Sequence, residues 1–99
     1  MKSIIQHFNQ VFENRVRLAV MSILVVNDSM DFNSLKQMLD LTDGNLASHM
    51  ATLEKHHYVS VAKQFVGKET STTYSATAAG RRSFAQHLDA LERLIRQSA

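Results

Sequence analysis

The residues best suited to chemistry in this sequence are polar side chains on one side of a short helical segment. Leu46, Met50 and Leu53 are four and three residues apart, a spacing that predicts a helix with these side chains buried. Either Thr42 or Asp43 can cap its start. The polar residues between them would face outward, where amide, hydroxyl and imidazole groups can hydrogen-bond to bases or phosphates. These outward residues are Asn45, Ser48, His49, Thr52 and Lys55.

Basic residues are concentrated at the end of this helix and beyond it. Residues 55–82 contain five basic residues and one acidic residue, Glu69, whereas the whole chain has a formal net charge of +2. Such asymmetry points to a polyanionic partner, although a charged cluster is also a common solvated surface. The five basic residues are Lys55, Lys63, Lys68, Arg81 and Arg82.

After Tyr58 the pattern changes from helical periodicity to alternation. The runs 59–66 and 70–77 are rich in residues that favour strands, and Gly67-Lys68 lies between them. This arrangement predicts a β-hairpin over 59–76, whose side chains could lie along phosphates or enter a minor groove. The candidate contacts on the hairpin are Lys63, Lys68, Thr70, Ser71 and Thr72.

Two helical patterns precede the polar helix. Apolar residues recur at helical spacing over residues 10–26, which predicts one long helix buried over much of its surface. A shorter pattern over 32–39 predicts an amphipathic helix capped by Asp31 or Asn33. Together with the polar helix it forms a predicted helix-turn-helix over 32–57.

A final helix is predicted over 78–97, with Thr77 as its cap. Arg81 and Arg82 lie in its first turn, where the helix dipole disfavours cations. We therefore consider Arg81 a candidate DNA contact, with a solubilising cluster that packs over its own domain as the equal alternative. The order of elements predicts one mainly α (α+β) domain over 1–99, a winged helix-turn-helix with a two-stranded wing.

The apolar stripe of the last helix is larger than a domain of this size readily covers. It could meet apolar residues from the start of the chain and then a second copy, giving a two-fold dimer. The second helix of a helix-turn-helix enters the major groove, so the two copies of the polar helix would lie on half-sites about one DNA turn apart. The alternative is that both ends of the chain close the core of one copy. The predicted interface residues are Ile4, Ile5, Phe8, Phe12, Phe84, Leu88, Leu91, Leu94 and Ile95.

The sequence gives little support to other kinds of site. Cysteine is absent, and His49, His56 and His57 lack a carboxylate or thiolate that would complete a metal site, so we expect no metal and no cofactor. A glycine-rich phosphate loop and a nucleophile with an attendant histidine and acid are also absent, so we expect no enzyme. The N-terminus does not resemble a signal peptide, and the apolar stretch 18–26 is too short to span a bilayer. A cytoplasmic location follows as the expectation.

Two stretches resemble a known family. LTDGNLASH at 41–49 and TTYSATAAGR at 72–81 are similar to the small winged-helix transcription regulators related to the MarR and ArsR groups, and the similarity covers residues 12–94. The resemblance implies a homodimeric regulator that binds DNA through the helix starting near Thr42 and the wing around Lys68. Its first and last helices would form the dimer. The chain lacks the cysteines of metal- or redox-responsive members and an extra domain for a ligand, so the resemblance does not imply a small-molecule effector. A pocket at the dimer interface is the place left for one.

Two functions are compatible with these observations. The first is sequence-specific binding of double-stranded DNA by a homodimer, on a palindromic operator, to regulate transcription. The second is a winged-helix module that binds only protein. The basic hairpin favours the first, because phosphates attract lysines.

Overall fold

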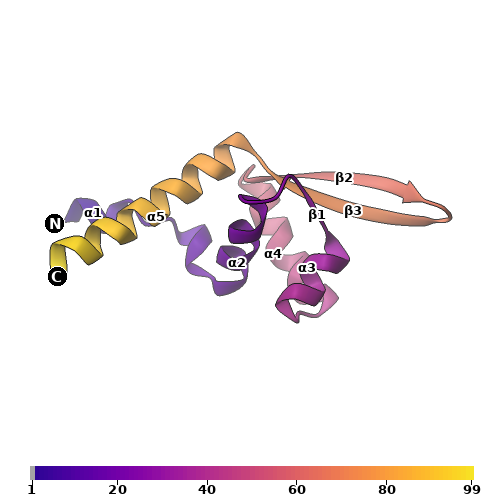
Figure 1. Cartoon of the computed structure of the whole chain (residues 1–99), viewed down its shortest axis with the longest axis horizontal. Coiled ribbons are helices and arrows are strands. Elements are labelled where there is room, and N and C mark those ends of the chain that lie inside the picture. Colours follow the sequence, from indigo (N-terminus) through magenta and orange to yellow (C-terminus); the bar gives the residue numbers. More distant parts are fainter. Residues whose placement is uncertain (1) are drawn as a thin grey trace.

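The structure is a computed structural model that describes the backbone of residues 2–99 and the side chains of residues 4–99. Its elements follow in the order α1 (Lys2–Gln6), the 3-10 helix η1 (Gln10–Glu13), α2 (Arg15–Leu24), β1 (Met30–Asp31), α3 (Phe32–Leu39), α4 (Asp43–Lys55), β2 (Val59–Val66), β3 (Glu69–Ala76) and α5 (Ala78–Ser98). Figure 1 shows α2, α3 and α4 as a central body, with α1 and α5 extending from one side and the hairpin β2–β3 from the other. The molecule is therefore elongated, with extents of 55 × 25 × 21 Å.

The predicted order of helix-turn-helix, hairpin and final helix is confirmed, but the expected single helix over residues 10–26 is wrong. Asn14 separates η1 from α2, because its backbone is extended and its side-chain oxygen accepts hydrogen bonds from the backbone N–H groups of Val16 and Arg17 at 2.9 and 3.2 Å. It therefore acts as the cap of a new helix. Asparagine competes with helical hydrogen bonds in this way, and the apolar periodicity did not reveal the break.

Side-chain caps define the starts of the helices that form the helix-turn-helix. Asp31 accepts a hydrogen bond from the Ser34 N–H at 3.0 Å and so caps α3. Thr42 caps α4 by accepting from the Asn45 N–H at 3.2 Å. In both cases the alternative cap considered from the sequence lies inside the helix. The predicted cap of α5, Thr77, is confirmed.

The three strands form an antiparallel sheet in the order β1–β3–β2. β2 and β3 pair along their whole length, up to Val66 opposite Glu69, and Gly67 turns the chain with a φ of +68°. β1 pairs only with Tyr74 and Thr73 at the base of the hairpin. Its two residues, like the short α1, are too few to produce a recognisable pattern, and neither element was predicted. Beyond β1 the hairpin projects, and both of its strands become exposed toward the turn.

The core lies where η1, α2, α3 and α4 meet beneath the sheet. Phe12 and Phe84 are 1% and 4% exposed, and their rings meet edge to face at 5.3 Å. Ile4, which is 4% exposed, is also buried. The expectation that these three residues lie in a dimer interface is therefore wrong: they are buried within one copy, as the alternative reading of the sequence proposed. The largest fully buried side chains are Phe12, Val20, Met21, Leu24, Leu35, Leu46, Met50 and Leu53.

A close backbone contact sets the point at which α5 leaves the body. The Thr77 N–H donates to the Tyr58 carbonyl oxygen at 3.0 Å, and the Thr77 hydroxyl donates to the His57 carbonyl at 2.7 Å. In the first turn of α5, a Cβ at Gly80 would lie 2.1 Å from the same Tyr58 oxygen. Only glycine permits this approach. Within residues 2–99, no helix is long and apolar enough to cross a membrane.

Candidate nucleic-acid interface

Helix α4 presents the face that the sequence predicted. Leu46, Met50 and Leu53 are buried against the body. Asn45, Ser48 and Lys55 are exposed on the outer side, as predicted. Gly44, Ala47 and Ala51 are exposed beside them, and the two alanines were not among the predicted contacts because their side chains cannot form hydrogen bonds. Small side chains let a helix approach another surface closely, and alanine can contact a thymine methyl group.

His49 lies on a flank of α4 rather than on its outer side. It is half-buried, and its Nδ1 is 2.9 Å from a guanidinium nitrogen of Arg17 on α2. A guanidinium can only donate, so Nδ1 accepts and Nε2 carries the proton of the neutral ring. Burial and, to a smaller extent, the charge of Arg17 lower the pKa of His49. The ring can therefore offer a hydrogen-bond donor to a base or phosphate, but no acceptor.

Two other predicted residues of α4 have local roles. The Thr52 hydroxyl donates to the Ser48 carbonyl oxygen at 3.3 Å, and the side chain is half-buried. Thr42 holds the first turn through its cap. Asp43, in that first turn, is paired with Lys36 of α3 at 2.8 Å, which offsets a negative charge next to the outer face. No sequence pattern indicates this ion pair, because its two residues belong to different helices.

The hairpin carries its candidate contacts outward. Lys63, Lys68 and Thr70 are exposed, while Thr72 is half-buried. Thr72 lies directly opposite Lys63 in the ladder between β2 and β3. Neither lysine forms an ion pair with any side chain of residues 4–99. Both ammonium groups can therefore interact with a polyanion.

The Arg81 side chain forms hydrogen bonds to the backbone of the same chain. Its guanidinium donates to the carbonyl oxygen of Val25 at 2.9 Å and approaches that of Leu24 at 3.5 Å. These carbonyls end α2, where the helix dipole favours a cation. The hydrogen bonds of Arg81 thus follow the packing alternative, although both Arg81 and Arg82 are exposed.

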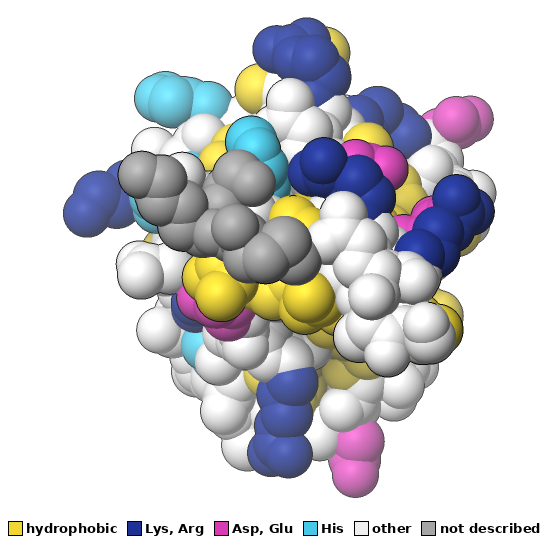
Figure 2. Space-filling view, turned by 90° about the vertical axis from the view of Figure 1, so that its left-hand side faces the viewer, with side chains coloured by type: hydrophobic (Ala, Val, Ile, Leu, Met, Phe, Trp, Pro, Cys, Tyr) yellow, Lys and Arg dark blue, Asp and Glu magenta, His cyan; other side chains and the backbone are white. Residues whose placement is uncertain are grey.

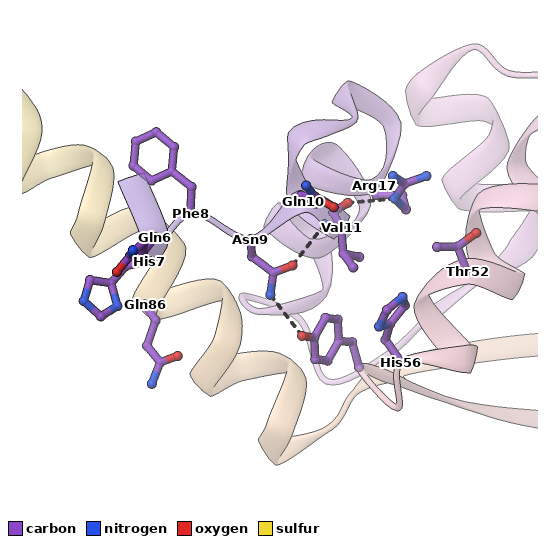
Figure 3. Close-up of a pocket in the computed structure, with 11 residues that line it drawn as sticks. Gln6, His7, Phe8, Asn9, Gln10, Val11, Arg17, Thr52, His56 and Gln86 are labelled. Carbon is purple, nitrogen blue, oxygen red and sulfur yellow. Dashed lines mark hydrogen bonds between the residues drawn. The ribbon is translucent and has the colours of Figure 1, made fainter. Parts of the chain in front are cut away.

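A pocket of about 640 Å³ lies between the extended segment that follows α1, helix α4 and helix α5. Figure 3 shows Asn9 on that segment, between Gln86 of α5 and Thr52 of α4. The Asn9 side chain donates to the Tyr58 hydroxyl at 2.9 Å, and its backbone N–H donates to Nδ1 of the buried His87 at 3.0 Å. Sequence reasoning did not identify Asn9, because its partners are far away in the chain. Asn9 therefore connects α5, through His87, to the body of the molecule, through Tyr58.

The arm of α1 and α5 leaves apolar side chains uncovered. Leu88 and Leu91 are each 44% exposed, Ile95 is 59% exposed and Ile5 is 68% exposed. Phe8 and Leu94 are half-buried. Seen from the end of the arm, hydrophobic side chains gather near the centre of the face, with basic side chains around them (Figure 2). This apolar arm surface comprises Ile5, Leu88, Leu91 and Ile95.

Comparisons with known proteins agree with this architecture. Residues 16–95 match the family model described as a winged helix DNA-binding domain. An uncharacterized protein of Methanocaldococcus jannaschii is 32% identical over 79 residues, which cover 80% of this chain and 86% of that protein. The solved structure of a transcriptional regulator homologue from Pyrococcus horikoshii is 29% identical, with a TM-score of 0.84 over 97% of this chain and 93% of the other.

More distant structures share the fold. YusO from Bacillus subtilis has a TM-score of 0.74 at 15% identity, covering 98% of this chain and 71% of YusO. NadR, solved in complex with 4-hydroxyphenylacetate, has a TM-score of 0.70 at 15% identity, covering 97% of this chain and 70% of NadR. The expected resemblance to winged-helix transcription regulators is thereby confirmed. Because the family model matches most of the chain, including the helix-turn-helix and the wing, this protein belongs to the winged helix DNA-binding domain family.

Proposed function

We propose that this protein is a homodimeric transcription regulator that binds double-stranded DNA at specific sequences. The observation that carries the proposal is the exposed outer side of α4, with Asn45, Ser48 and Lys55, next to a projecting hairpin whose Lys63 and Lys68 have no acidic partner among the described side chains. In this arrangement α4 enters the major groove and the hairpin lies on the neighbouring backbone or minor groove. Family membership supports DNA as the partner.

The apolar arm surface supports the homodimer. Four large apolar side chains on one elongated arm are costly to leave in water, and a second copy of the same arm would cover them by two-fold symmetry. Such a dimer presents two copies of α4 to two half-sites. The operator would therefore be palindromic, with half-site centres about one helical turn apart.

Selection of bound fragments from random double-stranded DNA, using the purified full chain, tests the proposal. The expected result is a palindromic motif, whose affinity falls steeply as salt rises because phosphate contacts release counterions. Enrichment of no motif, together with binding that does not depend on salt, would favour the alternative function of a protein-only interaction module.

The pocket beside Asn9 is the proposed place for a small-molecule effector. Its lining includes Arg17, His7 and His56, and none of the described lining residues is acidic, a composition that suits an anion. The similarly folded NadR was solved with the anion 4-hydroxyphenylacetate. Titration of this chain with that compound, followed by melting temperature and DNA affinity, tests the idea. A shift that Arg17→Met abolishes would support it, and no shift at millimolar concentration would rule out this compound.

A further inference from the structure

The tip of the hairpin exposes an aromatic side chain. Phe65 is 82% exposed, more than any other large hydrophobic residue among those described, and its neighbour Val66 is 66% exposed. A phenyl ring in water on a projecting hairpin contributes nothing to the core of this chain. An aromatic ring that is exposed in this way is free to contact a partner, and aromatic side chains contribute strongly to interfaces.

The strand register gives the direction of Phe65. Side chains alternate along β2, so Phe65 shares a face with Val59 and Val61. At the base of the hairpin this face packs on the body, since Val59 is 3% exposed and Tyr74, opposite Val61, is 8% exposed. The Phe65 side chain therefore points to the side of the sheet on which the helices lie. In Figure 1 the helices lie below the sheet, and the tip of the hairpin extends beyond α3.

The charges around Phe65 indicate the kind of partner. Lys63 lies on the same face two residues before it, and Lys68 follows at the turn. Thr70 stands directly opposite Phe65 and provides a hydroxyl group. Glu69, the acidic residue of the tip, pairs with Val66 on the other face. A ring between two cations matches a minor groove, in which phosphates border stacked bases.

We infer that Phe65 is a wedge that enters the minor groove of DNA and partly unstacks a base step, so that the wing reads the deformability of the sequence. Lys63 and Lys68 would hold the bordering phosphates. Pyrimidine–purine steps such as TA unstack most easily, so the site should favour them where the wing lies, without any hydrogen bond to a base. This inference rests on the proposed function, because it requires DNA on α4.

The experiment compares Phe65→Ala with the matched control Gln64→Ala, an exposed neighbour on the opposite face of β2. Each protein is titrated against the selected operator with either a TA step or a rigid A-tract under the wing, and the DNA bend is measured by energy transfer between its ends. The wild type and Gln64→Ala should prefer the TA duplex and bend it. Phe65→Ala should bind it about tenfold more weakly, lose the preference and bend it less.

The possible results distinguish a failure of the Phe65 wedge from a failure of DNA binding itself. Thermal melting should be the same for all three proteins, because Phe65 supports no core contact. If the wild type binds the operator and Phe65→Ala matches it in affinity, step preference and bend, the wedge is refuted while DNA binding stands. Loss of self-association in Phe65→Ala with unchanged DNA binding would also refute it, since the ring would then contact protein. Failure of the wild type to bind any duplex would instead refute the proposed function.

Discussion

Single side chains of α4 differ in how freely they can reach a base. Asn45 and Ser48 are exposed, whereas His49 is tied to Arg17. The helical spacing of its apolar residues was enough to predict which side of α4 faces outward. It could not predict the Arg17 contact, because that contact depends on how α2 crosses α4.

Asn45 is expected to contribute sequence preference rather than stability. Replacing Asn45 with Ala removes the amide but leaves its backbone N–H bonded to Thr42, so the helix should keep its cap. Discrimination between the preferred base and its substitutes should fall by about 1–3 kcal/mol at one position of each half-site. Competition binding with single-base operator variants measures this. An unchanged preference at every position would show that Asn45 contacts no base.

His49 makes stability depend on pH. The folded protein holds the pKa of His49 below its ordinary value, so the unfolded chain takes up the proton first as pH falls. The stabilising effect is therefore complete above the unfolded pKa of about 6.5 and is lost progressively below it, down to the folded pKa. Urea unfolding between about pH 8 and pH 5 should show a weaker pH dependence in His49→Gln than in the wild type. Identical dependence in both proteins would contradict this role.

Elements could be predicted from the sequence where their pattern is local and long. The helix-turn-helix, the hairpin with its Gly67-Lys68 turn, and α5 all follow from periodicity and caps. The break at Asn14, the two-residue β1 and the link through Asn9 do not, because each depends on a cap geometry or on partners distant in the chain. These contacts set how the elements are joined.

The junction of α5 with the body is expected to be intolerant of a side chain. A methyl group at Gly80 would overlap the Tyr58 carbonyl oxygen, so Gly80→Ala should lower the free energy of unfolding by about 2 kcal/mol or more. Gly44→Ala is the matched control, since its Cβ meets nothing within 4 Å and alanine favours a helix. Urea denaturation compares the two. Equal stability of both variants would mean that α5 can shift at no cost.

At the scale of the whole molecule, the sequence predicted an apolar stripe on the last helix. It did not predict which of these residues are buried in the core of one copy and which stay exposed. Phe12 of η1 and Phe84 of α5 close the core, while Leu88, Leu91 and Ile95 of α5 remain exposed. Helical periodicity assigns residues to one broad stripe, and only the position of α1 and η1 shows which part of it is covered.

The exposed part should hold the dimer together. Replacing Leu88 and Leu91 with Glu places two charges on each copy of the apolar arm surface, so the dimer should dissociate while each copy stays folded. Val26→Glu is the control, since Val26 is 78% exposed but lies just after the C-cap of α2, away from the apolar arm surface. Mass measured by light scattering at several concentrations should show a dimer for the wild type and the control, and a monomer for the double variant. A monomeric wild type would contradict the dimer.

The most direct test of DNA binding by α4 and the wing is the salt dependence of affinity for the selected operator. We compare the wild type with the variant that carries both Lys63→Glu and Lys68→Glu. If the two lysines contact phosphates, the variant should bind more weakly at every sequence. The negative slope of log K against log salt should become shallower by about two for each copy of the chain. Equal affinity and equal slope for both proteins would contradict the account.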